Sequence, residues 1–304
     1  MKNAVFGYYN IYRKDGIKRA IRSFYEYYYT KFKVNQRKKQ GNYIVKTHGC
    51  FMEVNPNDEG LSTELIAFGS HEPNTTKFVE KYLKNEMNCI DIGANIGYYS
   101  TLYSKKIGKN GKVISIEPSP ENFIFLKKNL EMQKMKNYSC HNVACGNYED
   151  TVNFCVDKRA NKCFVIENKE NMPPNYEIIS VPVKTIDQII KNEQFEKIDF
   201  VKIDVEGFEL NVLEGAKNLI QKYKPTIQIE IHCPKLGLNI SRKILQIFFD
   251  ESYEIIFFNE KLYKEFKEKE GSKKMNLKNL ISYIPNHNQK ISFKIIIEYQ
   301  KNES

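Results

Sequence analysis

A glycine-rich turn and two carboxylates occur where two consecutive strands of the chain are expected to end. Asp91 opens the segment DIGANIG, in which Gly93 and Gly97 allow a tight turn and a close approach of the backbone to a ligand. Glu117 ends the apolar run VISIE, where a carboxylate can accept both hydroxyls of a ribose. Ligands of open α/β sheets bind beyond the carboxyl ends of the strands. The pattern therefore predicts a ribose-containing ligand at this edge of the sheet.

This turn differs from the fingerprint of dinucleotide-binding proteins, because Asn95 occupies the position of the middle glycine in the motif G-x-G-x-x-G. Asp91 would repel a pyrophosphate, whereas it would attract a cationic amino-acid group. The expected ligand therefore carries a ribose and a positive charge but no phosphate. S-adenosylmethionine (SAM) meets these three conditions, and we predict it as the cofactor.

A second group of chemically active residues follows the later strands. The segment VKIDVEGFE places Asp204 and Glu206 at the end of one strand, beside the expected position of the methyl group of SAM. The segment IQIEIH places Glu230 and His232 two residues apart, so that both side chains share one face of a strand. Methyl transfer to a hydroxyl needs a base that takes the proton. Asp204 and His232 are our first candidates for this base, and Glu206 and Glu230 are the second.

Metal binding is an alternative role for part of this group. Asp204 and Glu206 could together hold Mg²⁺, which would acidify a bound hydroxyl, and the sequence does not separate this role from that of a base. We predict no metal ligand set and leave Mg²⁺ open as a second cofactor. The seven cysteines include no C-x-x-C pair, so we expect free thiols and no thiolate metal site.

The elements that position these residues follow from the hydrophobic pattern. Short apolar runs predict strands at residues 89–92, 112–116, 138–145, 198–203, 226–231, 254–258 and 293–299. Amphipathic segments predict helices at 96–107, 119–135 and 210–223, one that begins near residue 73, and one that contains 244–249. Residues 151–183 have the pattern of a β-rich insertion. Alternating strands and helices indicate a mainly parallel sheet that is covered on both faces.

Six segments resemble, in the same order, the FkbM-type family of SAM-dependent methyltransferases. They are DIGANIGYYS, ISIEPSPENFIFLKKN, HNVACGN, VPVKTIDQII, VKIDVEGFELNVLEGA and IQIEIH, and the resemblance covers about residues 60–232. It implies an α/β class I (Rossmann-like) methyltransferase fold, with strand order 3-2-1-4-5-7-6, an antiparallel seventh strand and helices on both faces of the sheet. It also implies O-methylation of a hydroxyl on a sugar, glycan or other small molecule.

The same resemblance implies roles for individual residues. The turn at 91–97, with Asp91, Gly93, Asn95 and Gly97, would hold the methionine part of SAM. Glu117 would bind the ribose, and Asn142 would lie near the adenine. Glu72 matches an acid of the family that faces the same cavity, whereas capping of the helix that begins at Pro73 is the alternative role for this residue.

Residues 1–47 carry the whole excess of positive charge. They contain 12 basic and two acidic side chains, so the net charge of this segment is +10, which equals the net charge of the entire chain. One apolar stripe with helical spacing runs along this segment, formed by Ile17, Ile21, Phe24, Tyr28 and Phe32. We therefore expect a basic amphipathic helical extension at 1–47, followed by a methyltransferase domain at 48–304 with its core at about 60–232.

The basic helix has three interpretations. Its stripe could pack on the domain, residues 17–39 could lie on an anionic membrane surface, or Tyr27–Tyr29 could stack on the bases of a nucleic acid. The last would make the protein an RNA methyltransferase. No secretory signal is visible, so we expect a cytoplasmic protein, with peripheral attachment to a membrane left open. A non-catalytic SAM-fold binding module is a further alternative, although the intact glycine turn favours an enzyme.

Overall fold

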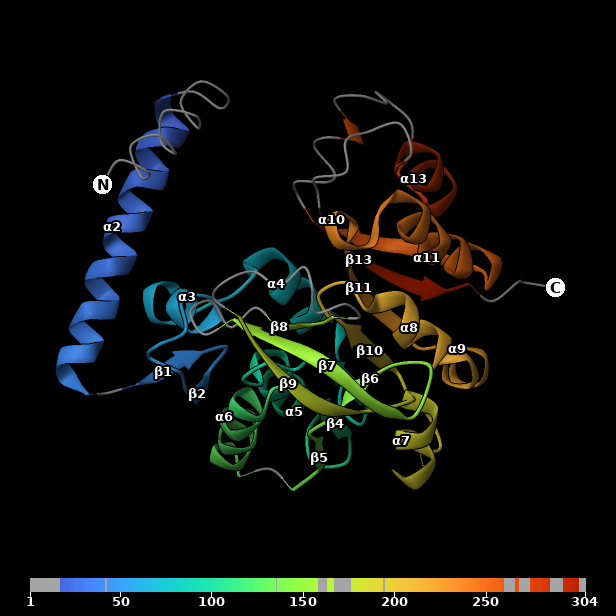
Figure 1. The fold of residues 1–304 in the computed structure, drawn as a ribbon, viewed down its shortest axis with the longest axis horizontal. Helices are drawn as coiled ribbons and strands as arrows, with labels where there is room; N and C mark the ends of the chain where they lie inside the picture. The colour runs from blue at the N-terminus through green and yellow to red at the C-terminus, as the bar shows by residue number, and fades with distance from the viewer. Residues whose placement is uncertain are drawn as a thin grey trace. The chain divides into compact units, whose positions relative to one another are not determined.

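The structure is a computed structural model of the chain, shown in Figure 1. It describes residues 17–41, 43–134, 136–157, 163–166, 176–193, 195–259, 266–267, 274–284 and 292–300. Parts of the predicted N-terminal extension and of the predicted insertion, namely residues 1–16, 158–162 and 167–175, lie outside the described residues. The chain divides into two compact units, Met1–His71 and Glu72–Ser304.

The described residues of the first unit, 17–41 and 43–71, form two helices and a β-hairpin. Helix α2 (Ile17–Gln40) includes the predicted apolar stripe. Strands β1 (Ile44–Thr47) and β2 (Cys50–Glu53) pair in an antiparallel hairpin, and helix α3 (Leu61–Phe68) follows. The two residues of the hairpin turn, His48 and Gly49, have positive φ angles, as the tightest hairpin turns require.

The second unit is built on a seven-stranded sheet. Its strands are β3 (Asn88–Ile92), β4 (Lys112–Ile116), β5 (Tyr138–His141), β10 (Phe200–Ile203), β11 (Thr226–His232), β12 (Tyr253–Phe258) and β13 (Ser292–Tyr299). They lie in the order β5-β4-β3-β10-β11-β13-β12, and β13 is antiparallel to both of its neighbours. In sequence order this is 3-2-1-4-5-7-6, so the predicted class I methyltransferase fold is confirmed.

Helices surround this sheet (Figure 1). They are α4 (Pro73–Tyr82), α5 (Tyr98–Ile107), α6 (Pro120–Met132), α7 (Ile186–Glu193), α8 (Glu209–Glu214), α9 (Lys217–Tyr223), α10 (Cys233–Leu236), α11 (Leu238–Asp250) and α13 (Leu277–Tyr283). Every residue of the central strand β10 is buried, which requires cover on both faces of the sheet. All seven cysteines are free, as predicted.

A second sheet contains the described part of the predicted insertion. Its strands β6 (Ala144–Cys145), β7 (Asp150–Asp157), β8 (Cys163–Val165) and β9 (Tyr176–Lys184) lie in the order β6-β9-β7-β8. The prediction of one continuous strand at 138–145 was wrong, because β5 ends at His141 and β6 pairs with β9 instead. Between them, the Asn142 side chain donates to backbone carbonyls that follow β4, which holds the chain at the edge of the main sheet.

The prediction of one helix at 210–223 was also wrong, because the chain forms α8 and α9 with a break at Gly215. A Cβ atom on Gly215 would lie 1.9 Å from the carbonyl oxygen of Gly146, so the two backbones are in direct contact there. The carboxylate of Asp187 accepts from the backbone N–H groups of Asn218 and Leu219 at the start of α9. The new helix start is therefore stabilised by a residue from α7.

Candidate active site

The glycine turn (residues 91–97) follows β3 and contacts the ends of both neighbouring strands. The backbone N–H groups of Gly93 and Ala94 donate to Ile116 at the end of β4, each at 3.0 Å. Gly93 has a φ angle of 78°, and a Cβ atom there would lie 1.9 Å from the carbonyl oxygen of Asp204. Only glycine fits this position, because the end of β10 already fills the space beside it.

Glu117 lies at the next strand end and is turned toward the glycine turn. Its Oε2 accepts from the backbone N–H of Asn95 at 2.8 Å, and its Oε1 accepts from that of Ser119 at 2.9 Å. Burial raises the pKa of Glu117 to about 7, although these hydrogen bonds act in the opposite direction. The Asn142 side chain donates to the carbonyl of Glu117 at 2.8 Å. Glu117, Asn95 and Asn142 are thus brought together, as a shared cofactor site requires.

Asp91 is completely buried beneath the glycine turn. It accepts a hydrogen bond from the hydroxyl of Ser100 at 2.6 Å and lies 3.2 Å from the ammonium of Lys202. Lys202 also donates to the carbonyl of Gly93 at 3.1 Å. The structure therefore shows Asp91 holding Lys202 under the turn, while direct attraction of a cationic ligand to Asp91 stays a prediction.

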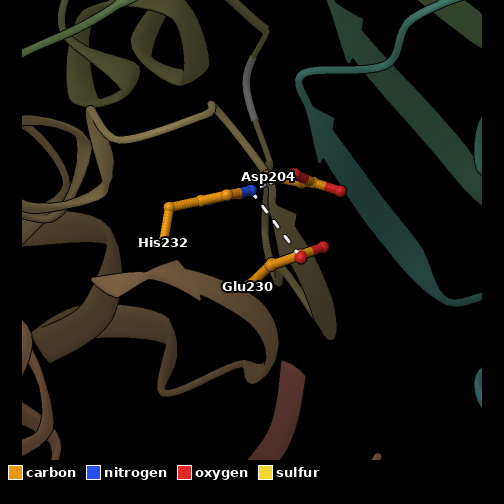
Figure 2. Close-up of side chains that lie close together, drawn as sticks. All are labelled: Asp204, Glu230 and His232. Carbon is orange, nitrogen blue, oxygen red and sulfur yellow. Dashed lines mark ion pairs between the residues drawn. The ribbon is translucent and has the colours of Figure 1, made fainter. Parts of the chain in front are cut away.

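The four predicted catalytic residues lie together at the carboxyl ends of β10 and β11, and we call Asp204, Glu206, Glu230 and His232 the acidic cluster. Figure 2 shows three of them, with the imidazole directed toward the carboxylates. The Nε2 atom of His232 is 3.6 Å from a carboxylate oxygen of Glu206, 3.7 Å from one of Glu230 and 3.9 Å from one of Asp204. The predicted grouping is thus present in the structure.

His232 is oriented by Glu209, at the start of α8. Its Nδ1 lies 2.7 Å from Oε1 of Glu209, whose side chain is completely buried. Burial disfavours the imidazolium, but Glu209 and the nearby carboxylates of Asp204 and Glu230 outweigh this effect and raise the pKa of His232 to about 9. His232 is then protonated at neutral pH, so the geometry favours the carboxylates as proton acceptors.

Lys294 is a functional candidate that the sequence reasoning missed. It lies on β13 with its ammonium 2.8 Å from both carboxylate oxygens of Glu72, 3.1 Å from Glu230 and 3.5 Å from Asp204. Burial lowers the pKa of Lys294, but these carboxylates reverse the effect and raise it well above its usual value. Its sequence signal, like that of Lys202, is a lysine inside an apolar strand.

Glu72 joins the same site. It precedes α4 with a φ angle of 45°, and its side chain makes no capping hydrogen bond to that helix. The capping alternative is therefore wrong. The carboxylate instead pairs with Lys294 and accepts from the hydroxyl of Tyr99 at 2.8 Å.

The second sheet contributes to the surroundings of the acidic cluster. The ammonium of Lys235 lies 2.6 Å from Oε2 of Glu206 and 4.6 Å from the centre of the Phe164 ring on β8. The insertion thus reaches the acidic cluster through this lysine.

Comparison with known proteins identifies the family of this chain. Residues 91–255 match the family described as Methyltransferase FkbM domain. This segment begins at the glycine turn and includes the whole acidic cluster. It confirms the family resemblance predicted from the six sequence segments.

Two curated relatives have related names. Methyltransferase 1 of Beauveria bassiana is 25% identical over 142 residues, which cover 41% of this chain and 57% of that protein. Hexuronic acid methyltransferase AglP of Haloferax volcanii is 28% identical over 144 residues, which cover 47% of this chain and 54% of that protein. The chain thus spans little more than half the length of these relatives.

A solved structure described as methyltransferase FkbM from Methylobacillus flagellatus KT is 18% identical, with a TM-score of 0.39, and the match covers 71% of this chain and 44% of that one. The family match itself extends over more than half of the sequence. This chain therefore belongs to the FkbM methyltransferase family.

Proposed function

We propose that the protein transfers a methyl group from SAM to a hydroxyl of a sugar, glycan or other small molecule. The observation that carries this proposal is the contact between Gly93 and Asp204. The carbonyl of Asp204 packs on the glycine turn, while its carboxylate belongs to the acidic cluster. The expected cofactor turn and the expected proton acceptor are therefore adjacent.

The residues at the ends of β3, β4 and β5 fit SAM. Gly93 lets the turn pack directly on the backbone at the end of β10. The carboxylate oxygens of Glu117 each accept one backbone N–H, which leaves further acceptor capacity for ribose hydroxyls. Asn142 is placed beside Glu117 for the adenine side. SAM, when bound, supplies a methyl group on a sulfonium that a nucleophilic oxygen can attack.

The chain's own residues would position the acceptor hydroxyl and take its proton. Asp204 is our first choice for the proton acceptor, since it is partly exposed and adjoins the glycine turn. Lys294 holds Asp204 and Glu230 in place through its ion pairs. The name of the relative AglP, a hexuronic acid methyltransferase, supports a sugar acceptor.

Calorimetry with SAM tests the cofactor first. We expect micromolar binding that Glu117→Ala weakens at least tenfold. Methyl transfer to a panel of hydroxylated acceptors then tests the reaction, and Asp204→Asn should abolish turnover while SAM binding stays intact. Tight SAM binding without transfer to any acceptor would instead favour the non-catalytic module.

We further propose that residues 17–39 contact an anionic membrane surface. In this proposal, residues 1–47 form an extension of a methyltransferase domain at 48–304. The stripe on α2 is exposed: Ile17 is 60%, Ile21 is 62% and Phe32 is 63% accessible. Lysines and arginines accompany these side chains along the helix. This combination is typical of helices that lie in the membrane interface. Among helices in the described residues, none is long and apolar enough to cross a membrane.

A further inference from the structure

Asp204, Glu230 and His232 converge at the carboxyl ends of β10 and β11 (Figure 2). One oxygen or nitrogen atom from each side chain lies within 4.8 Å of the other two. We infer that these three side chains bind a divalent cation of the Mg²⁺ or Mn²⁺ type. Carboxylate oxygens suit both ions, and imidazole is a frequent ligand of first-row divalent metals.

The spacing between the ligand atoms supports a shared ion over direct hydrogen bonds. Nε2 of His232 is 3.7 Å from Glu230 and 3.9 Å from Asp204, which is too far for a hydrogen bond. Two ligands that each lie about 2.1 Å from one ion are separated by about 3–4.2 Å. The two distances from Nε2 fall within this range, and the ligand atoms of Asp204 and Glu230 lie within 4.8 Å of each other, so a modest movement of the side chains would let one cation contact all three.

His232 is oriented as metal-binding histidines are. Its Nδ1 pairs with the buried carboxylate of Glu209, and its Nε2 points into the acidic cluster. A histidine ligand commonly gives its second ring nitrogen to a carboxylate in this way. The residue is only 6% exposed, and within the described part of the chain Nε2 makes no hydrogen bond. A buried nitrogen therefore faces the position expected for the ion, which would bind the neutral imidazole and so would compete with a proton for Nε2.

The charges around this position also leave room for a cation. Four carboxylates surround it: Glu72, Asp204, Glu206 and Glu230. Two ammonium groups offset part of their charge, that of Lys294 on one side and that of Lys235 beside Glu206. Asp91 and Lys202 balance each other beneath the turn. Glu209 and the imidazole of His232 add one group of each sign, and Lys202 also lies 3.8 Å from Asp204. Together these described side chains carry a net negative charge, which suits a divalent ion.

This inference rests on the proposed function and refines it. A cation here would contact the acceptor hydroxyl and lower its pKa, so that a weaker base suffices. Asp204 would then act as a cation ligand. Glu206, which lies next to His232 but outside the ligand set, would be the carboxylate left to receive the proton.

Titration of the full chain with Mn²⁺ in the absence of SAM and acceptor tests the site directly, with electron paramagnetic resonance as the measure of bound Mn²⁺. We expect one Mn²⁺ per chain, displaced by excess Mg²⁺. Asp204→Asn and His232→Gln should each weaken binding at least tenfold, and Glu209→Gln about tenfold through loss of orientation. Glu206→Gln is the matched control, because it removes a carboxylate at a similar distance from His232, and it should change the affinity less than threefold.

Failure of this inference is distinguishable from failure of the proposed function. No stoichiometric Mn²⁺ binding, or equal weakening by Glu206→Gln and Asp204→Asn, would overturn the cation site. SAM binding and methyl transfer that persist in EDTA would then still support the methyltransferase. Stoichiometric Mn²⁺ binding without methyl transfer to any acceptor would support the cation site and contradict the proposed methyl transfer. Unchanged SAM binding by each variant confirms that it is folded.

Discussion

Lys294 and Glu72 are 222 positions apart in the sequence, yet the lysine ammonium lies 2.8 Å from both carboxylate oxygens of the glutamate. The antiparallel strand β13 brings Lys294 next to β11, where its register partner is Glu230. A buried lysine from the last strand thus contacts the acids that precede α4 and follow β10. The C-terminal strand is therefore part of the site and not only part of the sheet.

Removal of this lysine should destabilise the fold. Lys294→Met leaves Glu72 and Glu230 without their buried counter-charge, and we expect a loss of about 3–5 kcal/mol in the free energy of unfolding. Lys243→Met is the control, since Lys243 forms an exposed pair with Glu214 and should cost less than about 1 kcal/mol. Urea unfolding of both variants measures the difference. Equal losses of unfolding free energy would show that the buried ion pairs of Lys294 stabilise the fold no more than an exposed pair does.

Gly93→Ala should weaken SAM binding because the added Cβ atom has no space, and not because the φ angle of this residue is positive. Its Cβ atom would clash with the carbonyl of Asp204, so the glycine turn must shift. Gly237→Ala is a matched control, since Gly237 has a similar φ angle of 77° but no atom within 4 Å of the added Cβ. Calorimetry with SAM should show at least a tenfold loss only for Gly93→Ala. Comparable losses for both would point to general strain.

Glu117 should make stability depend on pH in a defined direction. Its pKa is raised from 4.5 to about 7 in the folded protein. Between these two pH values the carboxyl group is protonated in the folded state and ionised in the unfolded state. Its contribution is fully present below about pH 4.5 and is lost as the pH rises toward 7. This corresponds to about 3 kcal/mol in the free energy of unfolding.

Glu117→Gln should remove that part of the pH dependence. Thermal or urea unfolding of both proteins between pH 4.5 and 7.5 checks the difference between the two curves. Parallel curves would mean that Glu117 is already ionised throughout this range in the folded protein.

The exposed stripe of α2 should govern binding to anionic vesicles. Ile21→Asp combined with Phe32→Asp should reduce co-sedimentation with phosphatidylserine vesicles at least fivefold, because both side chains belong to the stripe. Ser23→Asp combined with Thr30→Asp makes the same change of charge on the opposite side of the helix, and its effect should be much smaller. Equal losses would indicate simple charge attraction. Binding to RNA but not to vesicles would favour the nucleic-acid alternative.

The sequence by itself determined where most of the main strands lie along the chain, the glycine turn and the acids at the strand ends, whereas the order of the strands in the sheet came from the resemblance to the family. These features depend on local properties: apolar runs form strands, glycines permit the turn, and acids directly follow the strands that carry them. The grouping of Asp204, Glu206, Glu230 and His232 was predictable for the same reason, since adjacent parallel strands end at one edge of the sheet.

Only the tertiary structure decided which partners these residues have. Lys202 meets Asp91, and Lys294 meets Glu230, because strand register places them opposite each other, and register depends on contacts between distant segments. Glu209 orients His232 because α8 starts beside the end of β11, and the breaks after His141 and at Gly215 depend on contacts with β4 and with Gly146. No local pattern encodes such contacts, since each depends on two segments that meet only after the sheet has formed.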